Sequence, residues 1–164
     1  MPNRRDQIAM TPDEVAAFLA EERTVVCATN GHEGWPHLMP LWFVVRPTGP
    51  DGRPELWAWT FAKSQKVRNL ERDPRATLQV EAGTAYPELR GVMFECEVGI
   101  VRDVEEVLPL GLEIFARYAP PGAPADLAPE VRAMVRQQAE KRVGLRFAER
   151  RRASWDHRKL GGVY

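Results

Sequence analysis

The chain has 164 residues, which is long enough for one domain with a substantial core and short for two. Its 23 basic and 23 acidic residues balance to a formal charge of zero, so no overall field attracts it to nucleic acid or to an anionic membrane. No apolar run approaches the roughly 20 residues that a membrane span needs, and residues 1–7 lack the apolar stretch of a signal peptide. We therefore expect a single cytoplasmic domain over residues 1–164 that binds neither nucleic acid nor membrane.

The first expected elements are a helix and a hairpin. Thr11-Pro12-Asp13-Glu14 places a capping hydroxyl, a first-turn proline and a carboxylate in the order of a capping box, which predicts a helix start. Residues 24–29 have the composition of a buried strand, and residues 36–45 that of a second strand. The turn residues 30–34 between them predict a hairpin.

An aromatic strand over residues 55–60 is followed by a basic helix start, which is the most informative feature of the sequence. Ser64 can cap this helix, and Asp73-Pro74 ends it. Helix-start N–H groups, the positive end of the helix dipole and the ammonium groups of Lys63 and Lys66 would then converge on an anion such as phosphate. The alternative is a solvated helix with surface lysines.

The rest of the chain alternates strands and helices: strands over residues 75–80, 92–101 and 143–148, and helices after Asp103 and over residues 129–141. Pro109 and Gly111 predict an irregular or broken start for the first of these helices, and Gly99 marks a possible bulge in the long strand. Six strands with few helices predict a mainly β fold, a small antiparallel β-barrel with peripheral helices. Residues 150–164 are expected to be a polar C-terminal tail.

Several residues call for a choice between structural and functional roles. Alternation puts Trp57, Trp59 and Phe61 on one face of their strand, where they are core or flat walls for a planar ligand. Cys27 and Cys96 both fall in predicted strands, which favours reduced, buried thiols over a disulfide. The basic run at residues 149–152 is interpreted as a solvated strand end, because the net charge is zero and no groove-reading helix is present.

Four segments together resemble the split β-barrel family of the pyridoxamine 5'-phosphate oxidase type, and more closely its flavin/deazaflavin oxidoreductase branch. They are residues 34–43, the basic run over residues 63–75, residues 90–95 and residues 154–162. The resemblance covers nearly the whole chain. It implies an FMN-binding split barrel of six antiparallel strands, a homodimer with two cofactor sites at the subunit interface, and a bound redox cofactor. That cofactor is FMN or the 8-hydroxy-5-deazaflavin coenzyme F-420.

The resemblance also implies a set of cofactor-binding residues. A strand whose backbone lies along the isoalloxazine ring corresponds to His37, Leu38, Met39, Pro40, Leu41 and Trp42. The pair that follows it corresponds to Trp59 and Thr60, and the phosphate-gripping positions to Ser64 and Lys66, with Lys63, Gln65 and Asn69 beside them. In the tail, Trp155 is expected to reach the interface. Arg158 and Lys159 are expected to fold over the anionic cofactor of the same or the partner subunit.

Two departures from the family pattern favour the deazaflavin over FMN. Gln65 stands where the FMN-using oxidases carry an arginine, and Gly91 where they carry a glutamine. Replacing one cation by a neutral amide removes about 1.5–3 kcal/mol of charge-assisted hydrogen bonding to a phosphate dianion. A phosphodiester with one negative charge tolerates that loss better. Lys63, Arg68 and Arg72 would then serve the other anionic groups of coenzyme F-420.

The sequence therefore predicts an oxidoreductase in which the reduced deazaflavin passes hydride to a small conjugated acceptor. It contains no nucleophile elbow, zinc-binding HExxH pair, P-loop or CxxC pair, and its three histidines lack ligand spacing, so we expect no catalytic side chain and no metal. Two alternatives remain: an FMN-dependent oxidase or reductase of the same fold, and a non-catalytic protein that binds a cofactor or haem.

Overall fold

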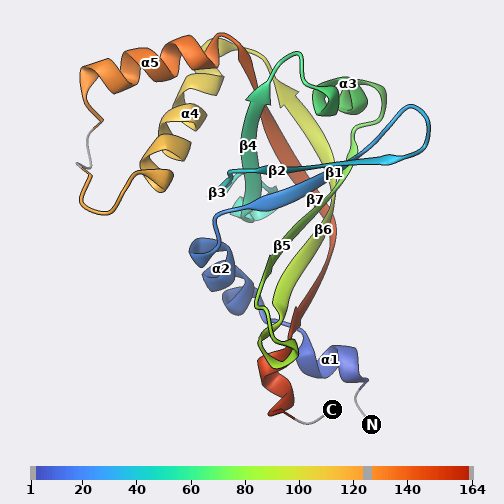
Figure 1. Cartoon of the computed structure of the whole chain (residues 1–164). Coiled ribbons are helices and arrows are strands. Elements are labelled where there is room, and N and C mark those ends of the chain that lie inside the picture. The colour runs from blue at the N-terminus through green and yellow to red at the C-terminus, as the bar shows by residue number, and fades with distance from the viewer. Residues whose placement is uncertain (1–2, 124–126, 163–164) are drawn as a thin grey trace.

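Alternating apolar and polar side chains build one antiparallel sheet of seven strands in a computed structural model that describes residues 3–123 and 127–162 (Figure 1). Its strand order is β2-β1-β5-β6-β7-β4-β3, which leaves β2 and β3 as edges, so hydrogen bonds do not close the sheet into a barrel. The strands are β1 (Val25–Asn30), β2 (Pro36–Leu41), β3 (Val44–Arg46), β4 (Glu55–Phe61), β5 (Arg75–Ala82), β6 (Arg90–Val101) and β7 (Arg142–Asp156).

Helices lie around this sheet. They are α1 (Arg4–Ile8), α2 (Pro12–Glu21), α3 (Gln65–Arg72), α4 (Val104–Tyr118) and α5 (Pro129–Ala139), with short 3₁₀ turns at Pro50–Gly52, Tyr86–Glu88 and His157–Leu160. The predicted mainly β fold with peripheral helices is confirmed. The capping box is present as well, since Thr11 Oγ1 accepts from Glu14 N and Glu14 Oε2 accepts from Thr11 N. None of the helices within the described residues is both long enough and apolar enough to span a bilayer.

The predicted number of six strands is wrong, because the segment 36–45 forms two strands instead of one. β2 pairs with β1 in the predicted hairpin and ends at Leu41, whereas β3 begins at Val44 and pairs with β4. Between them, the Tyr118 hydroxyl of α4 takes the place of a neighbouring strand. It lies 2.9 Å from Phe43 N and 3.0 Å from Phe43 O. The chain therefore leaves the β1 ladder at this point.

Two apolar clusters flank β4. The main core lies between α2, α3 and the inward face of the sheet, and it includes Phe18, Val67, Leu78 and Phe94. A smaller cluster lies under α4, where Leu110 and Ile114 are buried against Trp57 and Trp59 of β4 and against Tyr118. The two faces of β4 thus contact different cores, which agrees with the predicted alternation.

The predicted break at the start of α4 is absent, since the helix runs continuously through Pro109 and Gly111. Pro109 removes one intrahelical hydrogen bond without ending the helix. Gly111 is the point where the Trp59 ring contacts the helix: a Cβ there would lie 2.5 Å from Trp59 Cζ3. The glycine therefore permits a close approach of β4 and α4.

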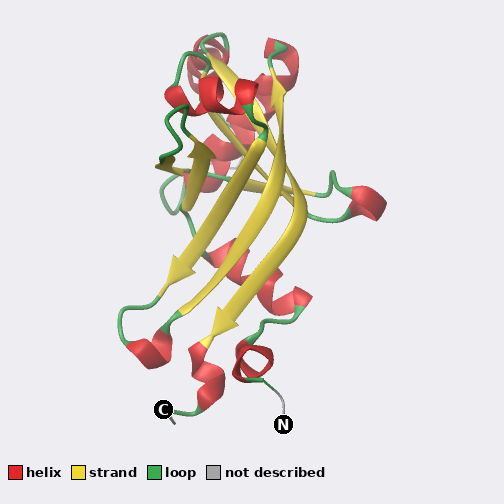
Figure 2. Ribbon diagram, turned by 90° about the vertical axis from the view of Figure 1, so that its right-hand side faces the viewer, coloured by secondary structure: helices red, strands yellow, loops and turns green. Residues whose placement is uncertain are grey.

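The C-terminal segment also differs from expectation. Residues 150–156 are the end of strand β7 and do not form a tail, because β7 pairs with β6 as far as Asp156. The irregularity in this ladder lies between Glu95 and Cys96, away from the expected position at Gly99. In Figure 2 the lower parts of the long strands lie side by side with no helix in front of them.

Candidate cofactor site

The loop between β4 and α3 forms the start of the candidate site. Ser64 occupies the N-cap position of α3, as the sequence predicts. Its hydroxyl makes no capping hydrogen bond, and Ser64 Oγ is buried without a hydrogen-bond partner in the described part of the chain. The first N–H groups of a helix lack intrahelical acceptors and carry the positive end of the dipole. A buried hydroxyl next to them is an unused polar group at a place suited to an anion.

Lys66, in the first turn of α3, is a buried cation. Its exposed fraction is 5%, and its Nζ donates to Thr60 Oγ1 at 3.2 Å. Within residues 3–123 and 127–162 it has no ion pair with a carboxylate. Burial lowers the pKa of Lys66, and the nearby Cys27 thiol opposes this shift. An ammonium group held in this way is unfavourable in the free protein, and an anion at this position would relieve the cost.

Hydrogen bonds along α3 attach the helix to β1. Asn69 is fully buried, and its Nδ2 donates to the buried Thr29 Oγ1 at 3.0 Å. Gln65 Nε2 in turn donates to Asn69 Oδ1 at 2.9 Å. Both amides are therefore used within the protein, and they position the helix start rather than offer free groups to a ligand.

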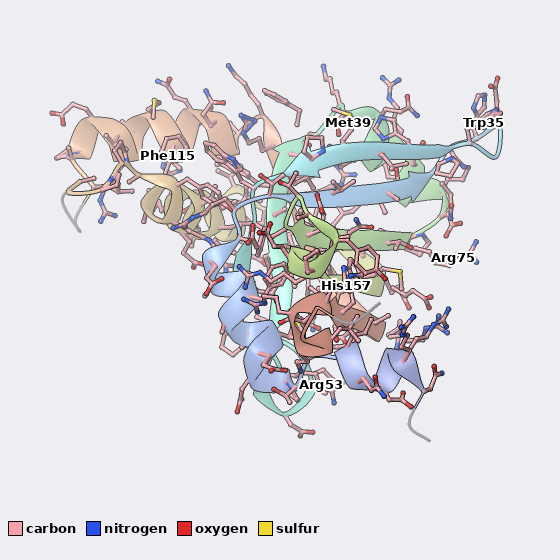
Figure 3. All side chains as sticks on the ribbon, turned by 60° about the horizontal axis from the view of Figure 1, so that its bottom comes forward. Trp35, Met39, Arg53, Arg75, Phe115 and His157 are labelled. Atoms are coloured by element: carbon pink, nitrogen blue, oxygen red, sulfur yellow. The ribbon has the colours of Figure 1, made fainter. Side chains whose placement is uncertain are left out.

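Strand β2 supplies one wall of the site through alternate residues. In the register of the hairpin, His37 lies opposite Thr29 and Met39 opposite Cys27, so these side chains share the face on which α3 packs. Figure 3 shows Met39 on the outer of the two hairpin strands. His37 Nδ1 is buried without a hydrogen-bond partner among the described residues. Leu38, by contrast, points to the opposite face and is 57% exposed.

Next to α3 and the hairpin turn lies a cavity of about 440 Å³. Two arginines of α3, Arg68 and Arg72, line it together with His37 of β2. Arg72 donates to Asn30 O at 2.5 Å, and neither arginine forms an ion pair with a carboxylate in the described ranges. Glu33 is the one acidic residue in its lining, and it lies 3.9 Å from His32. The cavity therefore has an excess of positive charge.

Two of the aromatic residues expected at the cofactor pack against α4. Thr60 faces Lys66, but Trp59 points to the other side of β4 and packs edge-on against Phe115 of α4, with ring centroids 6.3 Å apart. Trp42 follows the end of β2 and stacks on Tyr118 at 4.4 Å. The structure thus brings together the α3 residues, Thr60 and one face of β2, and it directs these two tryptophan rings toward α4.

Residues 11–147 match the sequence family described as Pyridoxamine 5'-phosphate oxidase. The chain belongs to this family. No curated protein matches the chain in sequence. Among solved structures, the conserved hypothetical protein Rv2991 from Mycobacterium tuberculosis is 40% identical with a TM-score of 0.83, and the match covers 99% of this chain and 95% of that one.

Two more distant structures share the fold of this pyridoxamine 5'-phosphate oxidase family member. The haem storage protein HutZ from Vibrio cholerae has a TM-score of 0.63 at 17% identity, with 85% of this chain and 90% of that chain covered. A protein named F-420 reductase has a TM-score of 0.57 at 20% identity, with 84% of this chain and 94% of that chain covered. At these identities the likeness shows a common fold.

In this member of the pyridoxamine 5'-phosphate oxidase family, two expected site residues lie far from α3 within one chain. Trp155 belongs to β7 and pairs with Gly91, near the chain ends and away from α3 (Figure 1). Lys159 Nζ donates to Ala9 O at 2.7 Å and pairs with Glu14 Oε2 at 2.6 Å. Neither residue can complete the α3 site of its own chain. Lys63 is exposed at the helix start, with no hydrogen bond or ion pair in the described parts.

Strand β1 contributes two residues to the site that were not predicted from the sequence. Cys27 and Thr29 are buried under α3, where one contributes an electrostatic interaction with Lys66 and the other accepts from Asn69. The signal was present, because alternation in the buried strand puts both residues on one face. Nothing in the sequence indicated that α3 would cover that face.

Proposed function

We propose that this protein is a deazaflavin-dependent oxidoreductase. It binds the reduced coenzyme F-420 between α3 and β2 and passes hydride to a small conjugated acceptor. One observation carries the proposal: among the described residues, Lys66 is a buried ammonium without a carboxylate, and the buried Ser64 hydroxyl close by in the chain has no hydrogen-bond partner. Both groups fit a phosphate ester, which would neutralise the first and accept from the second.

Ser64, Lys66 and the first turn of α3 form a cradle for an anion. The charge of this cradle supports a phosphodiester rather than a phosphate monoester. Lys66 is the buried cation in it, and Gln65 adds no charge and is engaged with Asn69. A phosphomonoester carries close to two negative charges near neutral pH, whereas a phosphodiester carries one. One buried ammonium therefore matches the deazaflavin coenzyme better than FMN.

The adjacent cavity supports the same choice. Arg68 and Arg72 line about 440 Å³ of space beside the cradle and lack carboxylate partners in the described residues. Coenzyme F-420 has an acidic tail beyond its phosphodiester, and FMN has none. We assign this cavity to that tail, with the orphan Nδ1 of His37 as a further polar contact.

When bound, a deazaflavin supplies hydride chemistry, and the protein supplies position and electrostatics. Lys66, Ser64 and the start of α3 hold the anionic group, and Thr60 holds the Lys66 ammonium in place. Asn69 and Thr29 attach α3 to the sheet, so the cradle is preformed. The face of β2 that carries His37 and Met39 provides a wall on which a planar ring can lie.

The proposed enzyme is a homodimer with sites at the interface. Trp155 lies at the other end of the sheet from α3, so within this proposal it reaches a cofactor only in a second copy. We also place the protein in the cytoplasm, in keeping with Cys27 and Cys96, which are free and buried.

The deciding experiment is a titration of the purified protein with coenzyme F-420 and, separately, with FMN, followed by tryptophan fluorescence. The variants are Lys66→Met and, as the control, Lys141→Met, which changes an exposed lysine outside the candidate site. We expect the wild type and Lys141→Met to bind coenzyme F-420 more tightly than FMN. Lys66→Met should bind at least about tenfold more weakly, since it lacks a charge-assisted hydrogen bond.

Other outcomes would assign a different function. Tighter binding of FMN would indicate an FMN-dependent oxidase or reductase. Binding of neither flavin, together with a Soret band on addition of haem, would indicate a haem-binding protein. His37 would then be the first ligand to test, because its Nδ1 is unpaired in the described structure and HutZ, a haem storage protein, shares the fold.

A further inference from the structure

A second cavity lies away from the candidate cofactor site. It has a volume of about 740 Å³ and is bounded by α2, β3, the start of β4 and α4. Leu56 of β4 lines this cavity, and Thr60 of the same strand contacts Lys66 at the cofactor site. They are four positions apart along the strand, a distance of about 13 Å. The two sites are therefore separate along β4.

The walls of the cavity are largely apolar. Val15 and Leu19 of α2, Leu56 of β4 and Phe94 of β6 are buried side chains of the main core. Two small residues spaced one helical turn apart on α2, Ala16 and Ala20, also line the cavity. Longer side chains at these two positions would fill it. A volume of this size is typical of small-molecule sites, which span roughly 300–1,000 Å³.

The acidic groups of the cavity are already neutralised. Glu149 accepts from Arg152 Nε and Nη2 at 2.7 and 2.5 Å. Glu113 accepts from Arg46 at 2.7 and 2.8 Å. Neither carboxylate is therefore an unpaired negative charge facing the cavity.

Two arginines in the lining are not neutralised in this way. Arg53 extends from the loop before β4 beside α2 (Figure 3), and Arg117 projects from α4. Neither forms an ion pair with a carboxylate among residues 3–123 and 127–162. Burial lowers the pKa of Arg117, and the nearby Arg23 acts in the same direction. Arg117 Nε is buried and has no hydrogen-bond partner in the part of the chain that the structure describes.

A structural role explains only part of the geometry of Arg117. Its Nη2 donates to Leu19 O at 2.6 Å and to Glu22 O at 2.9 Å, so it binds the last carbonyl groups of α2. A helix end carries only about half an elementary negative charge. The guanidinium also lies over the Phe43 ring, 4.6 Å from its centroid. These contacts include no carboxylate, so residual positive charge remains on a residue that lines the cavity. An anion with an apolar body has the complementary chemistry.

We propose that this cavity binds an amphipathic organic acid, an apolar acyl or aryl carboxylate. Its apolar body lies between α2 and β4, and its carboxylate lies toward Arg117 and Arg53. This site is independent of the cofactor site proposed above, so each can fail without the other.

The test compares decanoate with decanamide, a neutral ligand with the same chain, by isothermal titration calorimetry on the full-length protein. Wild-type protein should bind one decanoate per chain, at least tenfold more tightly than decanamide. Ala16→Trp should abolish binding of both ligands, because it fills the cavity. The matched control is Ala17→Trp, the next residue of the same helix, which is exposed and does not line the cavity, and it should bind as the wild type does.

The charge requirement is tested with Arg117→Gln and Arg53→Gln. Each variant should bind decanoate more weakly than the wild type does and bind decanamide with unchanged affinity. If Arg117→Gln unfolds because α2 loses its contact, Arg53→Gln carries this test. Equal affinity for decanoate and decanamide, or equal binding by Ala16→Trp and Ala17→Trp, would overturn the proposal. A change of oligomeric state in Ala16→Trp alone would also overturn it, by showing that a second copy occupies the cavity.

Discussion

Lys66 Nζ donates a 3.2 Å hydrogen bond to Thr60 Oγ1, and this hydroxyl is its one hydrogen-bond partner in the described structure. The contact joins α3 to the end of strand β4 and keeps a positive charge inside the protein. It satisfies one of the three donors of the ammonium group. Such an arrangement contributes little to folding and is suited to binding an anion.

The first prediction concerns the stability of Lys66→Met. Replacing the buried ammonium with an apolar side chain of similar length removes a desolvated, unpaired charge, so the free energy of unfolding should stay the same or rise by about 1–2 kcal/mol. Urea unfolding measures this directly. A loss of more than about 1 kcal/mol would show that Lys66 is structural.

The second prediction concerns pH. Burial lowers the pKa of Lys66 below its ordinary value of 10.5, which the unfolded chain restores. Between these two pKa values the unfolded chain binds more protons, so the folded state gains stability as the pH rises. The wild type should therefore gain stability relative to Lys66→Met as the pH rises from the lowered pKa of Lys66 toward 10.5. Both proteins contain the same cysteines, so the contribution of the cysteines largely cancels. A difference in the free energy of unfolding between the two proteins that stays constant with pH would contradict the lowered pKa of Lys66.

The third prediction concerns the two thiols. Burial raises the pKa of Cys27 to about 11 and that of Cys96 to about 12. Only the thiolate reacts, so near pH 8 both should react with an aromatic disulfide reagent at least about a hundredfold more slowly than in unfolded protein. In denaturant, both thiols should react with the reagent at once. Rapid reaction of one thiol in the folded protein would show that its strand opens.

The fourth prediction concerns Gly91 and Trp155. They are paired across β6 and β7, and a Cβ on Gly91 would lie 2.3 Å from Trp155 Cζ2. Gly91→Ala should therefore reduce the free energy of unfolding by about 1–3 kcal/mol. The same change in a Trp155→Ala background should have a much smaller effect, because the ring is gone. Equal effects in both backgrounds would show that the glycine is required for another reason.

The fifth prediction concerns Glu55, which is 3% exposed and accepts from Arg146 Nε at 2.8 Å. Burial acts to raise the pKa of Glu55, but hydrogen bonds from Arg146 and Thr48 outweigh it and lower the pKa. Arg146→Gln should lose about 2–3 kcal/mol of stability, because the buried carboxylate loses its cation. The loss should shrink as the pH falls through the lowered pKa of Glu55 and its carboxylate becomes protonated.

A control for this variant is Arg150→Gln, which breaks an exposed pair with Glu97. It should change the free energy of unfolding by less than about 0.5 kcal/mol, since exposed ion pairs contribute little. Losses of similar size in both variants would show that burial of Glu55 does not set the difference.

Local patterns predicted much of the fold, because each depends on neighbours in sequence. The capping box at Thr11, the β1–β2 hairpin and the helix after Ser64 all follow from short-range hydrogen bonding and alternation. The break between β2 and β3 was not predictable in this way. It depends on Tyr118, which lies 75 residues away and takes up the backbone groups of Phe43.

The same division holds for the candidate site. The sequence by itself determined that a serine and two lysines stand at a helix start after an aromatic strand. Only the tertiary structure decided that Lys66 is buried while Lys63 is exposed, because this depends on how α3 packs on Cys27 and Thr29 of β1. It also directed Trp59 toward α4 and placed Trp155 in a strand at the far end of the sheet. Side-chain burial and long-range pairing are properties of the packed sheet, and local sequence cannot specify them.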